Sequence, residues 1–197
     1  MFIEAKPLQG QYVKLELLTT AHIEPLAAAV SDGESWRLWY ASVPTPASMA
    51  HYVEQAMVAA QTGNIAYAVR DNCSGDIVGT TRFYDVQAAH KRACIGYTWY
   101  ADRVRRSAIN TESKLLLLNH LFTSSGAIAV EFRTHYFNHT SRQAIERLGA
   151  KLDGILRSHQ IMGDGSLRDT AVYSIVAAEW PAVRNNLQAR LHAYTRS

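Results

Sequence analysis

Two stretches of the sequence combine polar side chains with the expected start of a helix. The first, RVRRSAINTESK at residues 103–114, leads from the strand-like run ACIGYTWY into a leucine-rich helix expected from about Asn110 to Ser124. A helix N-terminus leaves about four backbone N–H groups unpaired and carries roughly half a positive charge, so that it can bind an anion. The arginines add charge, and Ser107, Asn110 and Thr111 add caps or hydroxyl donors. The stretch predicts an anion site or, more plainly, a capped helix with solvated arginines.

The second stretch is NHTSRQAIERLGA, which follows the strand-like run IAVEFRTHYF. Asn138 is a good N-cap, Ser141 lies in the first turn of the expected helix, and Gly149 ends it. Plain capping would explain these residues. However, two parallel strands that each end in a helix start would form a cleft where they separate, with one helix N-terminus for phosphates and the other supplying Asn and Ser.

The elements that must position these stretches follow from hydrophobic periodicity and turn signals. Strands are expected at 12–18, 65–70, 77–86, 94–100, 128–137, 152–161 and 169–177, and helices at 21–30, 48–63, about 110–124, 138–150 and 179–194. The order β-α-α-β-β-β-α-β-α-β-β-α predicts a mixed α/β fold on one sheet. A chain of 197 residues without a linker-like segment predicts a single domain, 1–197.

Composition excludes several function classes. The formal net charge is +3 and no Lys/Arg block occurs, so nucleic acid is not an expected partner, and an RNA-associated role is disfavoured. The longest apolar burst, LLLL at 115–118, is far shorter than the ~20 residues of a membrane span. The first residues lack the apolar run of a secretory signal. Two cysteines, Cys73 and Cys94, without a CxxC pair, favour a reduced cytoplasmic protein.

Several familiar catalytic motifs are missing. There is no Walker motif, and GDGSL is not a G-x-S-x-G elbow, so neither nucleotide hydrolysis nor a serine hydrolase is supported. His135 and His139 are four residues apart, but Asn138 is expected to start a helix between them and no HExxH motif exists. No metal site is therefore expected. Cys94 is interpreted as a strand residue that packs rather than reacts.

The two stretches together resemble the GCN5-related N-acetyltransferases. The run IGYTWYADRVRRSAINTESKLLLLNHLF resembles the family's core motif, whose acetyl-CoA pyrophosphate loop reads Q/R-x-x-G-x-G/A, and Asn138–Gly149 resembles the N-x-x-S-x-x-A-I-x-K-L-G motif of its ribosomal-protein N-terminal acetyltransferase-like branch. The element order fits along nearly the whole chain. The resemblance implies the acyl-CoA N-acyltransferase fold, in which a central, mostly antiparallel sheet is splayed between two parallel strands and flanked by helices.

The resemblance also implies a site for acetyl-CoA, without a metal. Arg105 takes the Q/R position, while Ala108 and Asn110 stand where the family has Gly and Gly/Ala. The pyrophosphate is expected on the amides from Arg106 to Thr111, and the pantetheine arm and thioester carbonyl on the backbone of Thr98 to Tyr100. The implied cofactor-binding residues are Thr98, Trp99, Tyr100, Arg105, Arg106, Ser107, Ala108, Ile109, Asn110, Thr111, Asn138 and Ser141.

Acetyl transfer to an amine makes three chemical demands. A backbone N–H must polarise the thioester oxygen, an amine with a pKa of about 10 must lose a proton, and the thiolate must be protonated. The resemblance assigns cofactor contact to Asn138 and thiolate protonation to Ser141. Glu131 is a candidate base and Asp85 its rival, although an ion pair between Glu131 and Arg133 would give the carboxylate a structural role.

The sequence gives fewer signals about which residues bind the acceptor. Trp36, Trp39 and Tyr40 lie in an irregular segment between the first two helices, where the family builds its substrate wall; core packing would explain one or two of them. The expected function is acetyl-CoA-dependent transfer to a protein N-terminus or a small amine by direct attack. The alternative is a non-catalytic CoA-binding sensor or interaction module on a degenerate scaffold. The family also suggests a homodimer.

Overall fold

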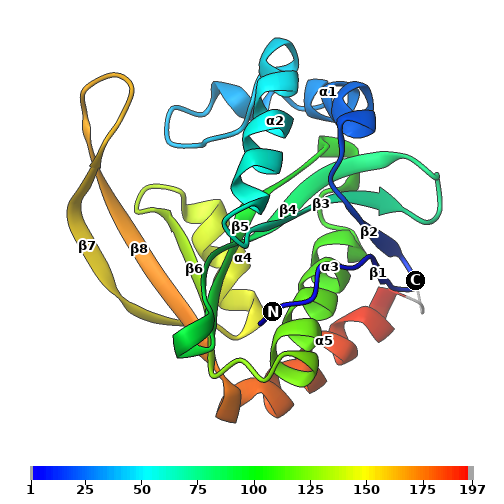
Figure 1. Ribbon diagram of the computed structural model, residues 1–197, viewed down its shortest axis with the longest axis vertical. Coiled ribbons are helices and arrows are strands. Elements are labelled where there is room, and N and C mark those ends of the chain that lie inside the picture. Colours follow the sequence, from blue (N-terminus) through cyan, green and yellow to red (C-terminus); the bar gives the residue numbers. More distant parts are fainter. Residues whose placement is uncertain (1, 195–197) are drawn as a thin grey trace.

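The computed structural model describes residues 2–194, and one eight-stranded sheet runs through it (Figure 1). The strands follow the order β1-β2-β3-β4-β5-β6-β8-β7, and every neighbouring pair is antiparallel except β5–β6. Their bounds are β1 Leu8–Gln9, β2 Val13–Leu17, β3 Ile65–Asp71, β4 Ile77–Gln87, β5 Arg92–Tyr100, β6 Ala129–His135, β7 Lys151–Ile161 and β8 Leu167–Val176.

The parallel pair β5–β6 is joined only at its beginning. Arg92, Ala93 and Cys94 pair with Ala129, Val130 and Glu131, and the two strands form no further pairs. β5 continues to residue 100 and β6 to residue 135, so their later residues diverge, as Figure 1 shows. We call these unpaired edges, residues 95–100 of β5 and 132–135 of β6, the fork. The splayed parallel pair that the resemblance implied is therefore confirmed.

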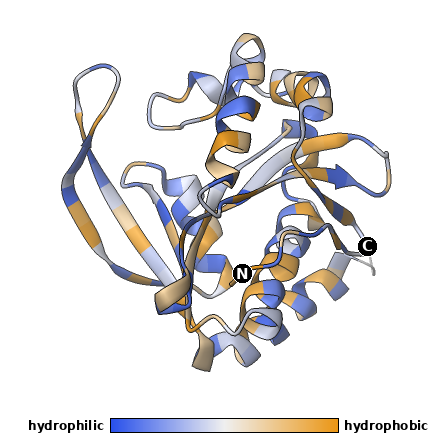
Figure 2. Ribbon diagram, in the orientation of Figure 1, coloured by the Kyte–Doolittle hydropathy of each residue, from blue (hydrophilic) through white to orange (hydrophobic). Residues whose placement is uncertain are grey.

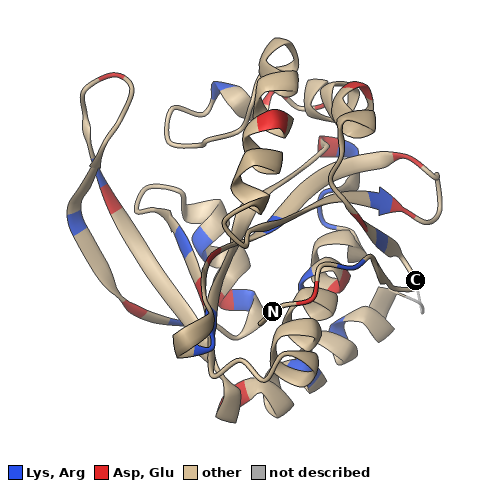
Figure 3. Cartoon of the chain, viewed as in Figure 1, with Lys and Arg blue, Asp and Glu red and all other residues tan. Residues whose placement is uncertain are grey.

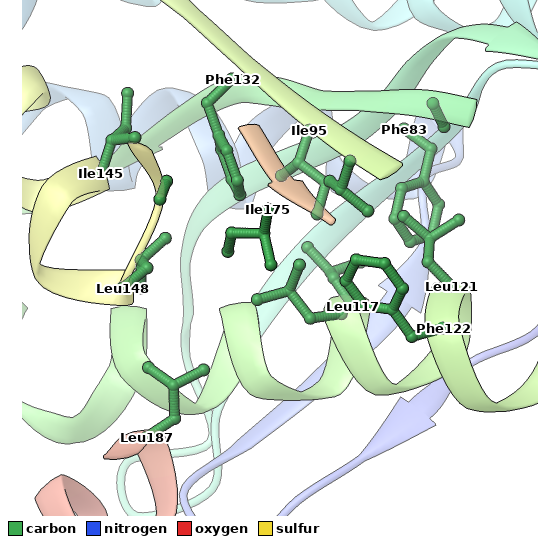
Figure 4. Close-up of a cluster of buried hydrophobic side chains, with 14 of the residues drawn as sticks. Phe83, Ile95, Leu117, Leu121, Phe122, Phe132, Ile145, Leu148, Ile175 and Leu187 are labelled. Atoms are coloured by element: carbon green, nitrogen blue, oxygen red, sulfur yellow. The ribbon is translucent and has the colours of Figure 1, made fainter. Parts of the chain in front are cut away.

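Helices cover both faces of the sheet. The helices α3 (Ala108–Asn119), α4 (His139–Leu148) and α5 (Trp180–Tyr194) share one hydrophobic cluster with the sheet, which includes the fully buried Leu117 and Ile175 (Figure 4). The helices α1 (Ile23–Ser31) and α2 (Met49–Ala60) form a second cluster around Leu26 and Met49. Figure 2 shows hydrophobic residues along the inner sides of these helices. The sheet is thus held between two cores.

The sequence predicted the order of strands and helices correctly, with two differences. A two-residue strand, β1, precedes the first expected strand because Leu8 and Gln9 pair with β2. Helix α3 begins at Ala108 rather than near Asn110, because Ser107 is its N-cap. The expected caps of α4 are confirmed: Asn138 begins the helix, and Gly149 ends it in a left-handed conformation with φ of 103°.

The surface carries both signs of charge. Figure 3 shows Lys and Arg interspersed with Asp and Glu over the sheet and the helices. Among residues 2–194, no helix is both long enough and apolar enough to cross a membrane.

Candidate active site

The turn between β5 and α3 brings backbone amides to the end of the fork. Residues 102–104 form one turn of 3₁₀ helix, and Ser107 then caps α3. The Ser107 hydroxyl donates to the carbonyl of Val104 at 2.6 Å and accepts from the N–H of Ile109 at 3.3 Å. The left-handed residue of this turn is Arg106, with φ of 61°. The turn therefore needs no glycine at position 108, because Ala108 is already the first helical residue.

Three backbone N–H groups at this helix start stay unpaired. Of the four that a helix leaves unsatisfied, Ile109 is capped by Ser107, whereas Ser107, Ala108 and Asn110 donate to no other described residue. Unpaired N–H groups at a helix start, together with the helix dipole, are able to bind an anion. Ala108 is only 5% exposed, so its methyl group packs against the protein.

The arginines of the same turn have different partners. Arg103 donates to Asp32 at 3.2 Å and to Asp76 at 3.3 Å. Arg105, which takes the Q/R position, forms an ion pair with Asp102 at 2.8 Å and donates to the Ser35 hydroxyl at 2.7 Å. Arg106 is exposed and has no ion-pair partner among the described residues. Arg106 is therefore the arginine of this turn whose charge is available to an anion.

Strand β5 carries a β-bulge at the fork. Arg82 of β4 pairs with Gly96 and Thr80 pairs with Trp99, so that one β4 residue faces both Tyr97 and Thr98. Tyr97 is left-handed, with φ of 51°. The bulge lies on the part of β5 that no longer pairs with β6. On that edge, the backbone groups of β5 form no hydrogen bonds to a neighbouring strand.

The side chains of the last β5 residues leave only the backbone for a ligand. Trp99 is buried in the cluster of α1 and α2, whereas Tyr100 packs against the cluster of α3. Thr98 donates to the carbonyl of Gly96 at 3.3 Å. Contact between a pantetheine arm and residues 98–100 would accordingly use backbone groups, as the resemblance implied.

A buried lysine lies beneath the bulge. The Lys114 ammonium donates to the hydroxyls of Thr81 at 3.0 Å and Thr98 at 2.7 Å, and these two hydroxyls are 2.9 Å apart. No carboxylate of the described residues forms an ion pair with it. Burial lowers the pKa of Lys114 to about 7. The motifs in the sequence did not predict a role for this residue, although a lysine on the apolar side of a leucine-rich helix was a signal.

The start of α4 presents two free polar groups. The Asn138 side-chain oxygen accepts from the N–H of Ser141 at 3.0 Å. This bond leaves the Asn138 amide nitrogen and the Ser141 hydroxyl without a hydrogen-bond partner in the part of the chain that is described. Both residues are partly exposed. Asn138 follows the end of β6 after two intervening residues, at the other side of the fork from the start of α3.

Both candidate bases are engaged in ion pairs. Glu131 contacts Arg92 with one oxygen and Arg133 with the other, at 2.9 Å in the second case. Asp85 contacts the same Arg133 at 3.2 Å. The pairing of Glu131 with Arg133 that the sequence left open is therefore present. The neighbouring Cys94 is buried, which raises the pKa of its thiol to about 12 and leaves it unreactive.

The three aromatic residues expected on the acceptor side separate into two groups. Trp36 is partly buried and packs against the cluster of α1 and α2. Trp39 is 55% exposed and lies edge-on to His135 at 4.9 Å and to Tyr40 at 5.5 Å between ring centroids. Phe137 stacks on His135 at 5.7 Å. Trp39 and Tyr40 therefore meet the end of β6, whereas Trp36 does not.

His135 adds a titratable group to this aromatic contact. Its Nδ1 accepts from the N–H of Phe137 at 3.1 Å, and its buried Nε2 has no partner among residues 2–194. Burial lowers the pKa of His135, and the positive charge of Arg168 lowers it further. The ring is therefore neutral near pH 7, with its proton on Nε2. No cluster of three or more His, Cys, Asp or Glu residues suited to a metal occurs within the described chain.

One arginine in the middle of β4 was also missed by the sequence analysis. Arg82 is buried beside the bulge, between the rings of Tyr52 from α2 and Tyr97 from β5. Its signal was a charged residue in the otherwise apolar strand IVGTTRFY.

Comparison with known proteins adds independent information about this arrangement. Residues 13–151 match the family described as "Acetyltransferase (GNAT) domain". A GCN5-related N-acetyltransferase structure from Brucella melitensis is 30% identical, covers 95% of this chain and 86% of its own, and has a TM-score of 0.87. An acetyltransferase structure from T. thermophilus is 30% identical, covers 97% of this chain and 100% of its own, and has a TM-score of 0.84. No curated protein sequence matches the chain.

More distant structures share the fold. The ribosomal L7/L12 alpha-N-protein acetyltransferase RimL is 18% identical over 87% of this chain and 94% of its own, with a TM-score of 0.76. The microcin C7 self-immunity acetyltransferase MccE, in complex with acetyl-CoA and AMP, is 20% identical over 85% of this chain and 93% of its own, with a TM-score of 0.72.

Proposed function

The chain belongs to the GNAT acetyltransferase family, and from this premise we propose that it transfers the acetyl group of acetyl-CoA to a primary amine. Residues 1–197 would act as one acetyltransferase domain, since a single sheet contributes to both cores. The observation that carries the proposal is the unpaired start of α3, placed where β5 has parted from β6.

The start of α3 fits the pyrophosphate of CoA. The N–H groups of Ser107, Ala108 and Asn110 have no partner among the described residues, and Arg106 supplies an unpaired positive charge beside them. An acetyl-CoA complex of the fold relative MccE supports this ligand. Arg105 would act indirectly, because its guanidinium holds the turn through Asp102 and Ser35.

The unpaired edge of β5 fits the rest of the cofactor. Backbone groups of Thr98–Tyr100 have no partner strand on the β6 side, and they would orient the pantetheine arm and donate to the thioester oxygen. When bound, acetyl-CoA supplies the acetyl group as an activated thioester. Lys114 would keep the bulge in position through Thr98, since its ammonium donates to that hydroxyl.

The chemical steps need a proton acceptor and a proton donor. The amine nitrogen forms a bond to the acetyl carbon, the carbon–sulfur bond breaks, and the amine proton is lost. We propose that Ser141 donates its hydroxyl proton to the leaving thiolate and regains a proton from water, and that the Asn138 amide nitrogen contacts the cofactor, because neither group has another partner among the described residues. The amine proton would leave through water, because Glu131 and Asp85 are both paired with Arg133.

The acceptor would approach from the side of α2 and the segment before it. Trp39 and Tyr40 together with His135 and Phe137 form an aromatic contact at the end of the fork. Aromatic faces with few polar groups are typical of small-molecule sites. We therefore favour a small amine as the acceptor; a protein N-terminus, the acceptor type named for RimL, would be the other class to test.

Two further properties belong to this proposal. Cys73 and Cys94 are both unpaired, as expected in a reducing cytoplasm, and we propose that compartment. We also propose a homodimer, formed through the β7–β8 hairpin. Large apolar side chains are exposed along it: Leu152, Ile155, Leu156, Ile161 and Leu167.

The function is tested by cofactor binding and turnover. Acetyl-CoA at millimolar concentration should raise the melting temperature of the protein, because a ligand that binds only the folded state stabilises it. Release of the CoA thiol should then depend on added amine in a panel of small amines and peptide N-termini. An unchanged melting temperature would rule out the cofactor site. Binding without thiol release across the panel would rule out the transferase activity.

A further inference from the structure

Arg82 is a buried positive charge without a counter-ion. Its guanidinium carbon lies 5.0 Å from the ring centroid of Tyr52 and 4.2 Å from that of Tyr97, and the residue is 5% exposed. We call these three residues the Tyr–Arg–Tyr stack. Within residues 2–194, the Arg82 side chain forms no ion pair and no hydrogen bond, and its Nη2 atom is fully buried.

Among residues 2–194, the other two buried charged side chains, Glu112 and Lys114, have hydrogen-bond partners, whereas Arg82 has none. The Glu112 carboxylate accepts from the N–H groups of Gln11, Tyr12 and Val13. Lys114 donates to two threonine hydroxyls. A guanidinium carries five N–H donors in its plane, which ring faces cannot accept well. Cation–π contacts offset only part of the free-energy cost of burying a charge without hydrogen bonds.

The rings of the stack are held in place before any ligand binds. The Thr80 hydroxyl donates to the carbonyl of Tyr97 at 2.9 Å, and the Tyr52 hydroxyl lies 3.1 Å from the Thr80 hydroxyl. Tyr84 supports Tyr97 from its edge, with 5.2 Å between ring centroids. The guanidinium therefore lies against two rings whose positions are set by other contacts.

The stack lies next to the place where the chemistry would occur. Arg82 pairs with Gly96, which immediately precedes the bulge residues Tyr97 and Thr98. The thioester would lie on the backbone from Thr98 onward. A group that binds Arg82 would thus belong to a molecule close to the acetyl group, on the face of the sheet that α2 covers.

We propose that Arg82 binds a carboxylate or phosphate group of the acceptor, which makes the acceptor a small amine that also carries an anionic oxygen group. The planar fork of an arginine matches both anions through two parallel hydrogen bonds. Because the rings cover most of the guanidinium, a compact oxyanion fits it better than a folded protein surface does. This inference rests on the proposed acetyl transfer, and its test must separate the two.

The test compares matched amines that differ only in the anionic group. Tyrosine is paired with tyramine, and O-phosphoethanolamine with ethanolamine, with acetyl-CoA saturating and thiol release as the readout. At least one anionic member should be used with about 10-fold higher kcat/KM than its partner, as a charged hydrogen bond supplies. The two pairs also show whether a carboxylate or a phosphate is preferred.

Two substitutions locate the effect at the stack. Arg82→Met keeps the apolar stem, and it should lower kcat/KM for the anionic amine about 10-fold or more, mainly through KM, while leaving the neutral amine within about 3-fold. Arg82→Lys keeps the positive charge but loses the planar guanidinium. Its kcat/KM for the anionic amine should lie between those of the native protein and Arg82→Met. Arg190→Met, on the exposed side of α5, is the matched control and should leave kcat/KM unchanged for both the anionic and the neutral amine. A similar loss for both members of a pair would show a structural role and overturn the inference.

Direct binding covers the case in which no tested amine is acetylated. With CoA saturating the start of α3, inorganic phosphate or benzoate should raise the melting temperature of the native protein and not of Arg82→Met. If neither anion stabilises the native protein, the inference is wrong even where CoA binds. If CoA itself fails to bind, the proposed function has failed, whereas an anion effect lost in Arg82→Met would still establish the anion site.

Discussion

At the scale of single residues, Ala108 shows why the proposed phosphate loop needs no glycine at this position. The left-handed conformation is taken by Arg106, and Ala108 is a helical residue whose methyl group is buried. The sequence showed the missing glycine but not the residue that replaces its conformational role. What remains for position 108 is its backbone N–H, which has no partner among the described residues.

Two substitutions of Ala108 should separate that N–H from the side chain. Ala108→Pro removes one N–H at the first helical position, where proline is tolerated, after an extended Ser107. We expect it to weaken CoA binding about 5–20-fold with little change in melting temperature. Ala108→Gly should leave CoA binding unchanged and cost about 1 kcal/mol of stability. Calorimetric titration with CoA measures both, and unchanged binding in the proline variant would argue against this phosphate site.

Lys114 should make stability depend on pH. Burial lowers its pKa from 10.5 to about 7, so the folded state holds the charged form less readily than the unfolded state does. The penalty is complete below about pH 7 and is relieved as pH rises toward 10.5. Between pH 7 and 8.5 the native free energy of unfolding should therefore rise relative to that of Lys114→Met, by about 1–2 kcal/mol.

Lys114→Met is a suitable reference because Thr81 and Thr98 can still bond each other. Denaturant unfolding of both proteins at pH 6.5, 7.5 and 8.5 measures the difference, and the other titrating groups cancel in it. If the free energies of unfolding of the two proteins change in parallel with pH, Lys114 does not have the lowered pKa that its burial indicates.

Glu131 tests the alternative that the sequence left open. Its carboxylate contacts Arg92 and Arg133, so Glu131→Gln should lower stability by about 1–3 kcal/mol, since it weakens both contacts. If the amine proton leaves through water, kcat should change less than about 3-fold. A fall of about 100-fold or more in kcat, with a changed pH–rate profile, would instead identify Glu131 as the base.

At the scale of elements, the start of α4 has a structural role, and we propose a chemical role for it as well. The Asn138 oxygen caps the helix, whereas its nitrogen and the Ser141 hydroxyl are free among the described residues. Ser141→Ala keeps the backbone N–H that the cap uses. We expect it to lower kcat about 10–100-fold with unchanged CoA affinity and melting temperature, because it removes only a proton donor.

A contrasting change separates the cap from catalysis. Asn138→Asp keeps an N-cap oxygen and should preserve stability, while it replaces the free amide by a carboxylate and should weaken CoA binding. Thermal unfolding and CoA titration of both α4 variants measure this. If Ser141→Ala retains full kcat at saturating acetyl-CoA, water rather than Ser141 protonates the thiolate.

The sequence predicted local elements better than the contacts between them. Periodicity and caps gave the strands and helices, because these depend on neighbouring residues, and Ser107 moved the start of α3 by only two positions. It did not predict the bulge at Tyr97, the burial of Lys114 under it, or the Tyr–Arg–Tyr stack. Those features arise from contacts among β4, β5, α2 and α3. Such contacts join residues far apart in the sequence, so local patterns do not predict them.

At the scale of the whole molecule, the fork depends on how far two strands pair. Three residues of β5 pair with β6, and each strand keeps its other neighbour, β4 or β8, along a greater length. The sheet thus stays continuous while one edge of β5 is left for a ligand. The resemblance to the family predicted this splay. It did not predict that Trp36 packs against the cluster of α1 and α2 while Trp39 and Tyr40 contact each other elsewhere.

The β7–β8 hairpin is the part of the molecule that projects from the core (Figure 1). Ile161 and Leu167 pair across it, and they are 78% and 61% exposed. Exposed apolar side chains next to an edge strand are typical of protein interfaces, and a second copy of this chain is the partner that we propose.

The double substitution Ile161→Lys with Leu167→Lys should convert a dimer to a monomer, since it places four charges in the interface. Light scattering after size-exclusion chromatography measures the mass. Val58→Lys, at a 63% exposed position on α2, is the control and should leave the dimer intact. Because both hairpin residues are exposed, far-ultraviolet circular dichroism of the monomer should match that of the native protein. A native protein that runs as a monomer at micromolar concentration would contradict the dimer, and a dimer that survives both lysines would move the interface to another surface.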